Sequence, residues 1–317
     1  MEKPSQIGPR QHRHPPWLKV RAAFGEEVHE LKQLLGGLKL HTVCQEARCP
    51  NMGECWRHGV ATFMILGDVC TRGCRYCAVS KGKPLDLDAA EPGRVAEAVQ
   101  VMGLRHVVIT SVDRDDLEDG GAGTFAATMD AIRRRCPGCV VEVLIPDFKG
   151  SADSLQVVLK AQPDILGHNI ETVPRLYPKV RGGGEYKRSL ELLRRAKQWA
   201  PEVVTKTGMM LGLGEGRDEI RQVMRDLVEQ GIRLLTLGQY LRPSRWHLPV
   251  VRYYYPQEFR YWKEVGEAMG FQHVESGPLV RSSYLADRQY AALQRKQSDV
   301  VAAQLALQHN DLPPGCE

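Results

Sequence analysis

Short apolar segments rich in β-branched residues alternate with amphipathic segments along most of the chain. Six segments have the length and composition of buried strands, and they cover residues 61–67, 106–110, 139–145, 164–170, 203–211 and 234–240. Helical spacing of apolar residues recurs between them, most clearly over residues 92–104, 124–135, 189–200 and 217–231. Strands that alternate with helices predict a parallel sheet with right-handed crossovers.

The six βα units predict an α/β fold, and more narrowly a partial (β/α)6 barrel of the TIM type. A doubly wound sheet fits less well, because no convincing nucleotide-binding glycine fingerprint follows a strand. Residues 1–60 are rich in Pro, Gly, Cys and charge, with one short helix predicted at residues 26–35. We therefore expect an N-terminal extension over residues 1–60, the barrel over 61–275 and a C-terminal extension over 276–317. Both extensions are expected to cover the open face of the barrel.

The overall composition excludes several classes of protein. With 43% hydrophobic and 26% charged residues in 317, the chain is typical of a globular protein and not of a disordered or fibrous one. No apolar run approaches the ~18 residues that cross a bilayer, and the N-terminus lacks the apolar core of a secretory signal. The net charge of +5 is mild, and no base-reading motif is present. We expect a cytoplasmic protein, monomeric, without a membrane or nucleic-acid partner.

Cysteine is distributed unevenly along the chain. There are 9 cysteines, and six of them lie between Cys44 and Cys77. Structural disulfides are rare in a reducing compartment, so this concentration indicates metal or cluster ligation. Farther along, Cys136 and Cys139 form a C-x2-C pair between a helix and a strand. Zinc binding and redox chemistry are alternatives for this pair, but we favour two half-buried free thiols.

One group of three cysteines directly follows a predicted strand. Cys70, Cys74 and Cys77 form a loop with the spacing C-x3-C-x2-C. A four-iron cluster needs thiolates close together, and these spacings let one tight loop supply three of them. Gly73 permits the sharp turn. Three cysteines leave one iron open to a substrate or cofactor. The alternative is a structural zinc site, which usually takes four ligands in paired C-x2-C form, so the spacing favours the cluster.

The upstream group has the rarer spacing C-x4-C-x5-C and comprises Cys44, Cys49 and Cys55. A second iron–sulfur cluster is the more specific hypothesis for this group. A zinc site is the alternative, with His41 or His58 as a fourth ligand. A second cluster in one enzyme has three possible roles: it relays electrons, binds the substrate, or is consumed as a source of sulfur.

Several polar and glycine residues directly follow predicted strands. In barrels the carboxyl ends of the strands gather at one rim, where the chemistry takes place. The candidate cofactor-binding residues at this rim are Thr110, Ser111, Asp113, Asn169, Glu171, Gly212, Gly214 and Glu215. Glycines in the segment "GLGE" allow close approach of the backbone to a ligand, although a glycine-rich turn alone is a weak signal. The carboxylates after residue 112 lack calcium-loop spacing, and a hydrogen-bonded rim without ligands is the alternative.

The cysteine loop, with Tyr76 before its last cysteine, resembles that of the radical S-adenosylmethionine superfamily. In that superfamily the open iron chelates S-adenosylmethionine, and the reduced cluster cleaves it to a 5′-deoxyadenosyl radical. Longer segments between residues 44 and 287 together resemble the lipoyl synthase family: "CQEARCPNMGECW", "TSVDRDDLEDGGA", "HNIETVPRLY", "GQYLRPSRWHLPV" and "GPLVRSSYLAD". The resemblance implies sulfur insertion at C6 and C8 of an octanoyl chain on a lysine of a lipoyl carrier domain or H protein.

The resemblance also implies which residues hold the cofactors. Two 4Fe–4S clusters and S-adenosylmethionine are expected, with Cys70, Cys74 and Cys77 as the catalytic cluster ligands. The auxiliary cluster, the expected sulfur donor, takes the three upstream cysteines and one serine of "RSSY", for which Ser283 is preferred over Ser282. Taken alone, Ser283 is typical of a helix N-cap or turn. An electron donor such as ferredoxin or flavodoxin is the second expected partner.

Two other functions compete with this interpretation. One is another radical sulfur-inserting enzyme, such as a methylthiotransferase or a biotin synthase-like protein, whose auxiliary ligands differ. The other is a non-enzymatic iron–sulfur electron carrier, which would not cleave S-adenosylmethionine after reduction. The length of the predicted barrel counts against the carrier.

Overall fold

The computed structural model of the protein describes residues 14–19, 26–46 and 49–295. Its main feature is an eight-stranded sheet in the order β1-β2-β5-β6-β7-β8-β9-β10. The strands are β1 (His41–Thr42), β2 (Val60–Ile65), β5 (His106–Ser111), β6 (Val140–Leu144), β7 (Ile165–Gly167), β8 (Val204–Leu211), β9 (Leu234–Gln239) and β10 (His273–Gly277). All neighbours pair in parallel except β1, which is antiparallel to β2. A small parallel pair, β3 (Val69–Cys70) and β4 (Ser80–Lys81), lies outside this sheet.

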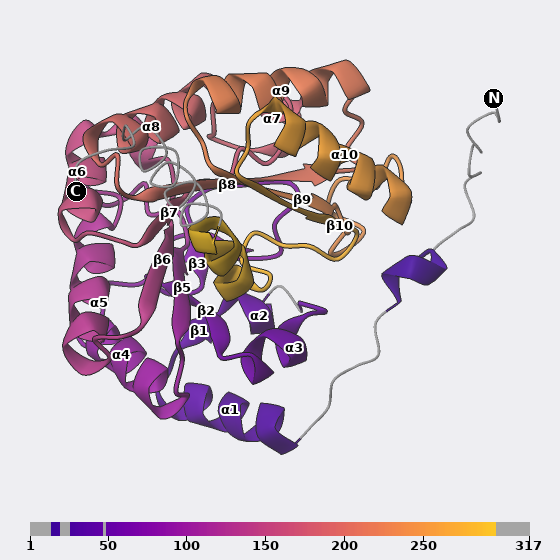
Figure 1. Ribbon diagram of the computed structural model, residues 1–317. Coiled ribbons are helices and arrows are strands. Elements are labelled where there is room, and N and C mark those ends of the chain that lie inside the picture. The colour runs from indigo at the N-terminus through magenta and orange to yellow at the C-terminus, as the bar shows by residue number, and fades with distance from the viewer. Residues whose placement is uncertain (1–13, 20–25, 47–48, 296–317) are drawn as a thin grey trace, which may run out of the picture.

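Helices follow the parallel strands and cover the convex face of the curved sheet (Figure 1). They are α4 (Glu91–Val101), α5 (Ala122–Arg135), α6 (Ala152–Lys160), α8 (Tyr186–Trp199), α9 (Arg217–Glu229) and α10 (Pro256–Met269). The shorter or flanking helices are α1 (Glu26–Gly37), α2 (Val43–Glu46), α3 (Met52–Arg57), α7 (Tyr177–Val180) and the 3-10 turns η1 (Pro16–Leu18), η2 (Phe148–Gly150) and η3 (Pro174–Leu176). The predicted α/β partial barrel with six βα units is confirmed. None of the helices in the described ranges is long and apolar enough to cross a membrane.

The burial of these strands explains why they were visible in the sequence. Every residue of β2 and of β9 is buried, as expected for parallel strands covered on both faces, so each is a continuous apolar run. On the helices, the buried residues recur every three or four positions, for example Ile220, Val223, Met224 and Leu227 of α9. These faces pack on the sheet and form the cores beneath the helices.

Two edge strands were not predicted from the sequence. Strand β10 contains one fully buried apolar residue, Val274, and otherwise lacks a hydrophobic pattern. It forms because its backbone pairs with β9 in register from His273 opposite Leu234 to Gly277 opposite Gly238. This seventh parallel strand crosses the expected boundary at residue 275, so the sheet extends into the C-terminal segment. Strand β1 has only two residues, too few for any periodicity.

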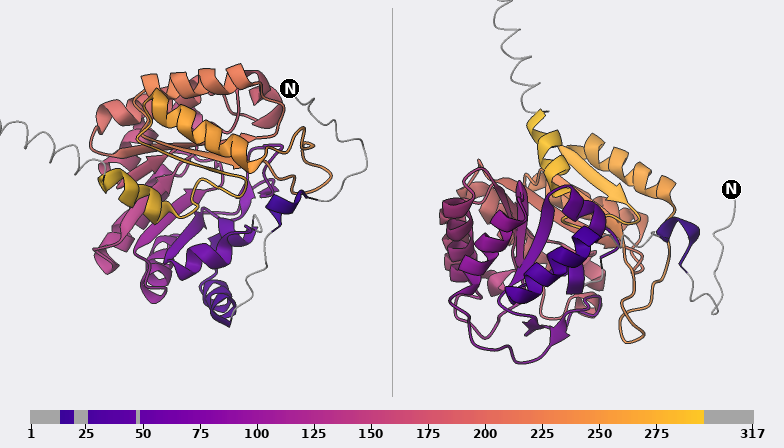
Figure 2. Two further views of the ribbon diagram at one scale, coloured as in Figure 1. Left: turned by 45° about the vertical axis from the view of Figure 1, so that its right-hand side comes forward. Right: turned by 90° about the horizontal axis from the view of Figure 1, so that it is seen from below.

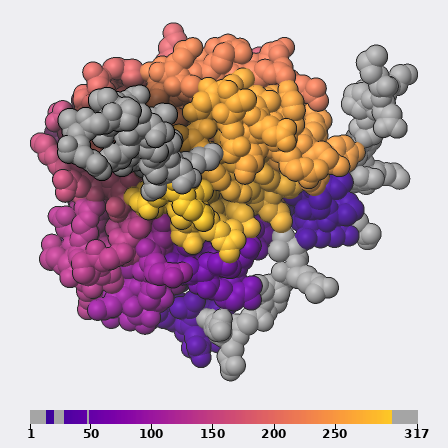
Figure 3. Space-filling view, in the orientation of Figure 1, coloured from indigo at the N-terminus to yellow at the C-terminus, as the bar shows by residue number. Residues whose placement is uncertain are grey.

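The two terminal segments meet on the concave side of the sheet (Figures 1 and 3). Asn51 donates a hydrogen bond from Nδ2 to the carbonyl of Leu279 (2.7 Å), and the Tyr284 hydroxyl donates to Glu54 (3.1 Å). Helical residues 286–295 pack on the first residues of several strands through Ala286 and Leu293. This packing covers the amino-terminal end of the barrel interior. Of the predicted extensions, residues 1–13, 20–25, 47–48 and 296–317 lie outside the described residues.

Candidate functional site

The first cysteine loop lies at the carboxyl end of β2, as predicted. Cys70 ends β3, Cys74 is buried, and the backbone N–H of Cys77 donates to the carbonyl of Cys74 at 3.4 Å. The N–H of Thr71 donates to the carbonyl of Asp113 (3.0 Å), which ties the loop to the segment after β5. The three cysteines therefore share one compact turn at the rim of the barrel.

Burial sets the protonation of these thiols. It raises the pKa of Cys74 to about 12 and the pKa of Cys77 to about 11, and it also raises the pKa of Cys70. Each thiol is therefore neutral at pH 7 when nothing is bound. Because iron binds the thiolate, cluster binding must displace these protons. Three free thiols on one turn form a donor set that fits the corner of a four-iron cluster.

Arg72, inside this loop, is the centre of a buried ionic network. Its side chain is 3% exposed and contacts Asp147 at 2.6 Å, Asp115 at 2.7 Å and Asp113 at 3.4 Å. Burial alone raises the pKa of Asp147, but the hydrogen bond and charge of Arg72 outweigh burial and lower it to about 2. Arg72 therefore fastens the cysteine loop to the ends of β5 and β6. This role of Arg72 was not predicted from the sequence, although one Arg between the cysteines and a later run of Asp are visible there.

Replacing Arg72 with glutamine is expected to destabilise the protein strongly. The substitution leaves Asp147 fully buried without its main cation, and breaking a buried ion pair costs roughly 3–5 kcal/mol. Denaturant unfolding under anaerobic conditions measures the change in the free energy of unfolding. Arg194→Gln is the control, because Arg194 pairs with Glu191 on an exposed face of α8 and little change is expected. Equal midpoints for the two variants would contradict a central role for Arg72.

The last residues of β5 include an unpaired hydroxyl at the rim. The Thr110 hydroxyl donates to the carbonyl of Leu144 (2.8 Å), so it is engaged within the sheet. Ser111 Oγ is buried and has no hydrogen-bond partner among the described residues. Asp113 Oδ2 lies 3.8 Å from Cys70 Sγ. A buried, unsatisfied hydroxyl beside the cysteine loop is the kind of group that a polar ligand satisfies.

Asn169 and Glu171 follow β7 and lie next to the cysteine loop. Asn169 Nδ2 donates to Glu171 Oε1 at 3.1 Å, and Glu171 has a positive φ of 64°. Burial raises the pKa of Glu171, and Arg181 and a hydrogen bond from Tyr76 oppose this rise. A Cβ on Gly208 would lie 2.8 Å from Asn169 Oδ1, so the glycine makes room for this amide. Arg181, whose Nη1 donates to the carbonyl of Asn169 (2.6 Å), was not singled out from the sequence.

The "GLGE" segment forms a tight loop after β8. Gly212 has φ 112°, and a Cβ there would lie 2.6 Å from the carbonyl oxygen of Arg252, so only glycine fits. Gly214 also has a positive φ, 108°, but a Cβ there would make only an ordinary contact with the Val251 side chain, at 3.6 Å. The Glu215 carboxylate accepts from the N–H of Gly212 (2.6 Å) and of Leu213 (2.9 Å). Both carboxylate oxygens therefore hold the loop in shape.

His168, directly after β7, is a buried neutral histidine. Its Nδ1 donates to the carbonyl of Ile145 (2.8 Å), and Ser189 Oγ lies 2.9 Å from Nε2. Burial, followed by the charge of Arg181, lowers its pKa from 6.5 to about 3. A charge on this ring would face a guanidinium in the protein interior.

Stability is expected to fall as the pH falls below about 6.5, with His168 as one cause. The unfolded chain binds a proton near pH 6.5, whereas the folded chain resists it until about pH 3. The contribution of His168 is thus complete above pH 6.5 and is lost progressively below it. Thermal midpoints measured between about pH 7.5 and 5.5 should have a shallower pH slope in His168→Gln than in the parent. Visible cluster absorbance at each pH is the control, and identical slopes would contradict the expectation.

The second triad lies where the two terminal segments meet. Cys44 is in α2, Cys55 is in α3, and the N–H of Cys49 donates to the carbonyl of Cys44 at 3.0 Å. Burial raises the pKa of Cys44 to about 11 and the pKa of Cys55 to about 12, and each is raised further by the charge of Cys49. These mutual effects place the three thiols within electrostatic range of one another.

The "RSSY" segment contacts this triad. Ser283 Oγ accepts a hydrogen bond from the Thr62 hydroxyl at 2.8 Å, and hydrogen bonds from Thr62 lower the pKa of Cys44. A backbone hydrogen bond from Leu285 similarly lowers the pKa of Cys55. Residues separated by more than 200 positions therefore meet at one point on β2.

The two histidines considered as fourth zinc ligands of the upstream triad make other contacts in the structure. None of the His, Cys, Asp or Glu side chains of the described residues form a group of three that could hold one metal ion. His58 donates from Nδ1 to the carbonyl of Glu54 (2.8 Å), and its Nε2 lies 2.7 Å from Arg288 Nη2. His41 contacts Glu46 at 3.5 Å. In a four-iron cube each thiolate binds a different iron, so convergence on one ion is not required.

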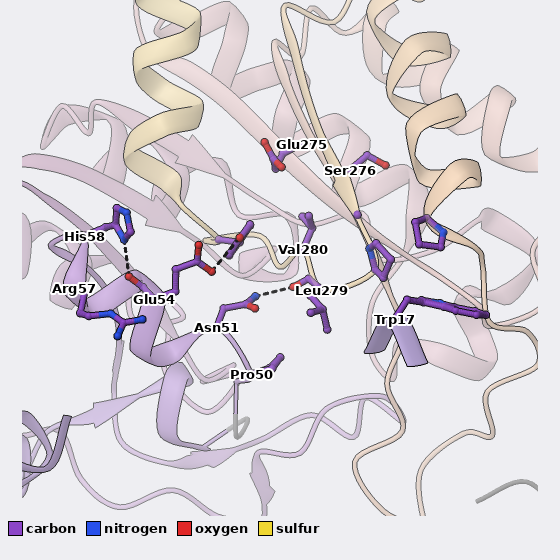
Figure 4. A pocket seen from close by; sticks show the side chains of 14 residues that line it. Trp17, Pro50, Asn51, Glu54, Arg57, His58, Glu275, Ser276, Leu279 and Val280 are labelled. Carbon is purple, nitrogen blue, oxygen red and sulfur yellow. Dashed lines mark hydrogen bonds between the residues drawn. The ribbon is translucent and has the colours of Figure 1, made fainter. Parts of the chain in front are cut away.

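A cavity of about 660 Å³ lies between the two terminal segments (Figure 4). Its walls come from Trp17 and Pro256, from five residues between Pro50 and His58 and from residues between Glu275 and Tyr284, and no cysteine of the second triad lines it. The Asn51–Leu279 and Glu54–Tyr284 hydrogen bonds cross between these walls. By contrast, Cys136 and Cys139 lie at the start of β6, at the opposite end of the sheet from the rim, and both are free thiols.

Comparisons with known proteins agree with this geometry. Residues 64–227 match the family model described as the radical SAM superfamily, and residues 2–49 match that of the N-terminal domain of lipoyl synthase. The chain is 61% identical over 279 residues to the lipoyl synthase of Rubrobacter xylanophilus, covering 88% of this chain and 87% of that one. It is 58% identical over 275 residues to that of Koribacter versatilis, covering 87% and 90%. Streptococcus suis SuiB bound to its precursor peptide SuiA shares the fold alone, with TM-score 0.52 and 10% identity over 75% of this chain and 49% of that one.

The fold and the cysteine loop at its rim define a radical S-adenosylmethionine enzyme. Its cofactors are S-adenosylmethionine and 4Fe–4S clusters, two of them in the lipoyl synthases. The chain belongs to the lipoyl synthase family. The recognition made from the cysteine spacing and the later segments is confirmed, and the electron-carrier alternative is excluded.

Proposed function

We propose that the protein inserts two sulfur atoms, at C6 and C8, into an octanoyl chain amide-linked to a lysine of a lipoyl carrier domain or H protein. One observation carries the proposal: both cysteine triads lie next to the same strand, β2. Thr62 of β2 links Ser283 to the surroundings of Cys44, and β2 ends at Ile65, just before the first cysteine loop. Three residues of a strand span roughly 10 Å, a distance that an extended acyl chain bridges.

We assign the ligands as the sequence predicted. Cys70, Cys74 and Cys77 hold the first cluster, with S-adenosylmethionine on its open iron. Cys44, Cys49, Cys55 and Ser283 hold the second cluster. When bound, the first cluster and its cofactor supply hydrogen abstraction, and the second cluster supplies sulfur.

The chain's own residues prepare the reaction site. Arg72 fixes the first cysteine loop, and the glycine loop at Gly212 lets the backbone approach the cofactor closely. Ser111, Asp113, Asn169 and Glu171 provide polar groups at the rim, where we place the cofactor, together with Thr110, Gly214 and Glu215. The extensions 1–60 and 276–317 close the remainder of the barrel 61–275 and exclude water from the reacting chain.

The partners and location follow from the same chemistry. We propose that a ferredoxin or flavodoxin supplies electrons, because the reaction begins with a reduction that the chain cannot perform alone. Free thiols at all six ligand positions need a reducing compartment, which supports a cytoplasmic location. We propose a monomeric protein, since each triad and the rim are built from one chain.

Anaerobic reaction with an octanoylated carrier domain, S-adenosylmethionine and dithionite tests the function. The mass of the carrier should rise by two sulfur atoms as the dithiol, or by two sulfurs less two hydrogens as the cyclic disulfide. A methylthiotransferase would instead add a methylthio group to the substrate. Cleavage of S-adenosylmethionine with an unchanged carrier mass would contradict the proposal.

A further inference from the structure

The connection between β9 and α10 exposes apolar side chains beside the rim. This loop, residues 240–255, projects from the body of the molecule (Figure 2). Trp246 is 79% exposed and Val251 is 64% exposed. A tryptophan this exposed buries little surface within its own chain, and exposed tryptophans are enriched at protein interfaces.

The loop is fastened to the cofactor site. His247 Nε2 lies 2.9 Å from the carbonyl oxygen of Cys77, and the N–H of Leu248 donates to the carbonyl of Arg75 at 3.1 Å. The N–H of Val251 donates to the carbonyl of Gly212 (2.8 Å). Trp246 is therefore held next to the first cysteine loop and the glycine loop, at the entrance to the barrel.

Exposed cations lie on the segments beside this entrance. Six exposed cations on the segments that border the first cysteine loop form no ion pair with any carboxylate in the described ranges: Arg75, Lys81, Lys83, Lys179, Arg242 and Arg245. Arg245 lies over the Trp246 ring, with its guanidinium carbon 5.1 Å from the centroid. We call Trp246 and these six residues the entrance surface.

We propose that the entrance surface docks the protein domain that carries the acylated lysine, through a negatively charged face around that lysine. The inference rests on the proposed function, because it concerns the substrate of the same site. An acyl-lysine arm must enter the barrel while its domain stays outside, so the domain must contact the entrance. Unpaired cations there favour an acidic partner, and Trp246 provides an apolar anchor at the centre of the contact.

The electron donor is the other candidate occupant of the same surface. The two occupants are separable, because dithionite replaces the donor but not the carrier. A short octanoyl-lysine peptide without acidic residues likewise replaces the carrier while keeping the reacting chain. The combination of two reductants and two substrates therefore identifies which protein uses the surface.

The experiment compares Trp246→Ala and Arg242→Glu/Arg245→Glu with the parent, with dithionite as reductant. For the octanoylated domain, KM is expected to rise roughly tenfold or more in each variant, with little change in kcat. For the peptide, both constants should stay at parent values. Added salt should weaken the parent's binding of the domain more than that of the charge-reversed variant. Arg134→Glu, at the exposed end of α5, is the matched charge control and should behave as the parent.

Direct binding of the octanoylated domain, followed by fluorescence anisotropy without turnover, keeps the docking proposal testable on its own. Weaker binding in both variants supports docking even if the parent converts neither substrate, a result that would contradict only the proposed function. Unchanged binding and unchanged KM for the domain overturn the docking proposal. An equal loss of activity on the domain and on the peptide would also overturn it. So would a loss of activity that appears only when a flavodoxin replaces dithionite.

Discussion

The substitution Cys49→Ala is expected to abolish sulfur insertion and spare the reductive cleavage of S-adenosylmethionine, whereas Cys74→Ala is expected to abolish both. The reason is spatial separation. Cys49 faces Cys44 and Cys55 beside the C-terminal segment, and Cys74 is buried in the rim loop near Arg181. Loss of one thiolate therefore removes one cluster without disturbing the ligands of the other.

Three measurements on anaerobically prepared protein separate these outcomes. Iron content should fall from about eight to about four atoms per chain in each variant. 5′-Deoxyadenosine should still form with Cys49→Ala and should be absent with Cys74→Ala, and neither variant should change the mass of the carrier. Cys139→Ala is the matched control, because this half-buried thiol lies at the other end of the sheet and should leave all three readouts unchanged. A Cys49→Ala protein that no longer cleaves S-adenosylmethionine would show that the two sites are not independent.

The strands of the barrel were predictable because they are buried on both faces. Strand β2 is apolar almost throughout, and such a run has few alternatives to a parallel strand. Strand β10 was not predictable, because its sequence "HVESG" carries no pattern and its pairing partner β9 supplies the hydrogen bonds. Edge strands of this kind are determined by the sheet they join and not by their own residues.

In the candidate site, too, the features set by local sequence were predictable and the contacts between distant segments were not. The cysteine spacing identified the first loop because all three ligands lie within eight residues of one another, so local sequence determines their proximity. The contact between Thr62 and Ser283 joins residues 221 positions apart, and only the packing of the C-terminal segment creates it. Arg72 was missed for a related reason: its three carboxylate partners come from two other segments of the chain. Glu215 stays a predicted cofactor residue, while its contacts within the chain hold the glycine loop.

Ser283→Ala is expected to leave both clusters in place and to reduce sulfur insertion to background. Three cysteines still hold the second cluster, but the oxygen ligand that we propose for its fourth iron is removed. Oxygen is a less usual ligand than thiolate for cluster iron and is more easily replaced, which suits a cluster that must release sulfide. The Thr62 hydroxyl, 2.8 Å from Ser283 Oγ, is positioned to orient this oxygen.

The neighbouring serine provides the control for this prediction. Ser282→Ala removes the same group one residue away, and Ser282 has no described hydrogen bond to the triad, so product formation should persist. Mössbauer spectra of the second cluster, isolated in a Cys74→Ala background, should show a changed environment at one iron in Ser283→Ala only. If Ser283→Ala still forms product at the parent rate, or if both alanine variants lose it equally, Ser283 is not the fourth ligand. The second cluster would then be held by its three cysteines, with its remaining iron bound by a group from outside these residues.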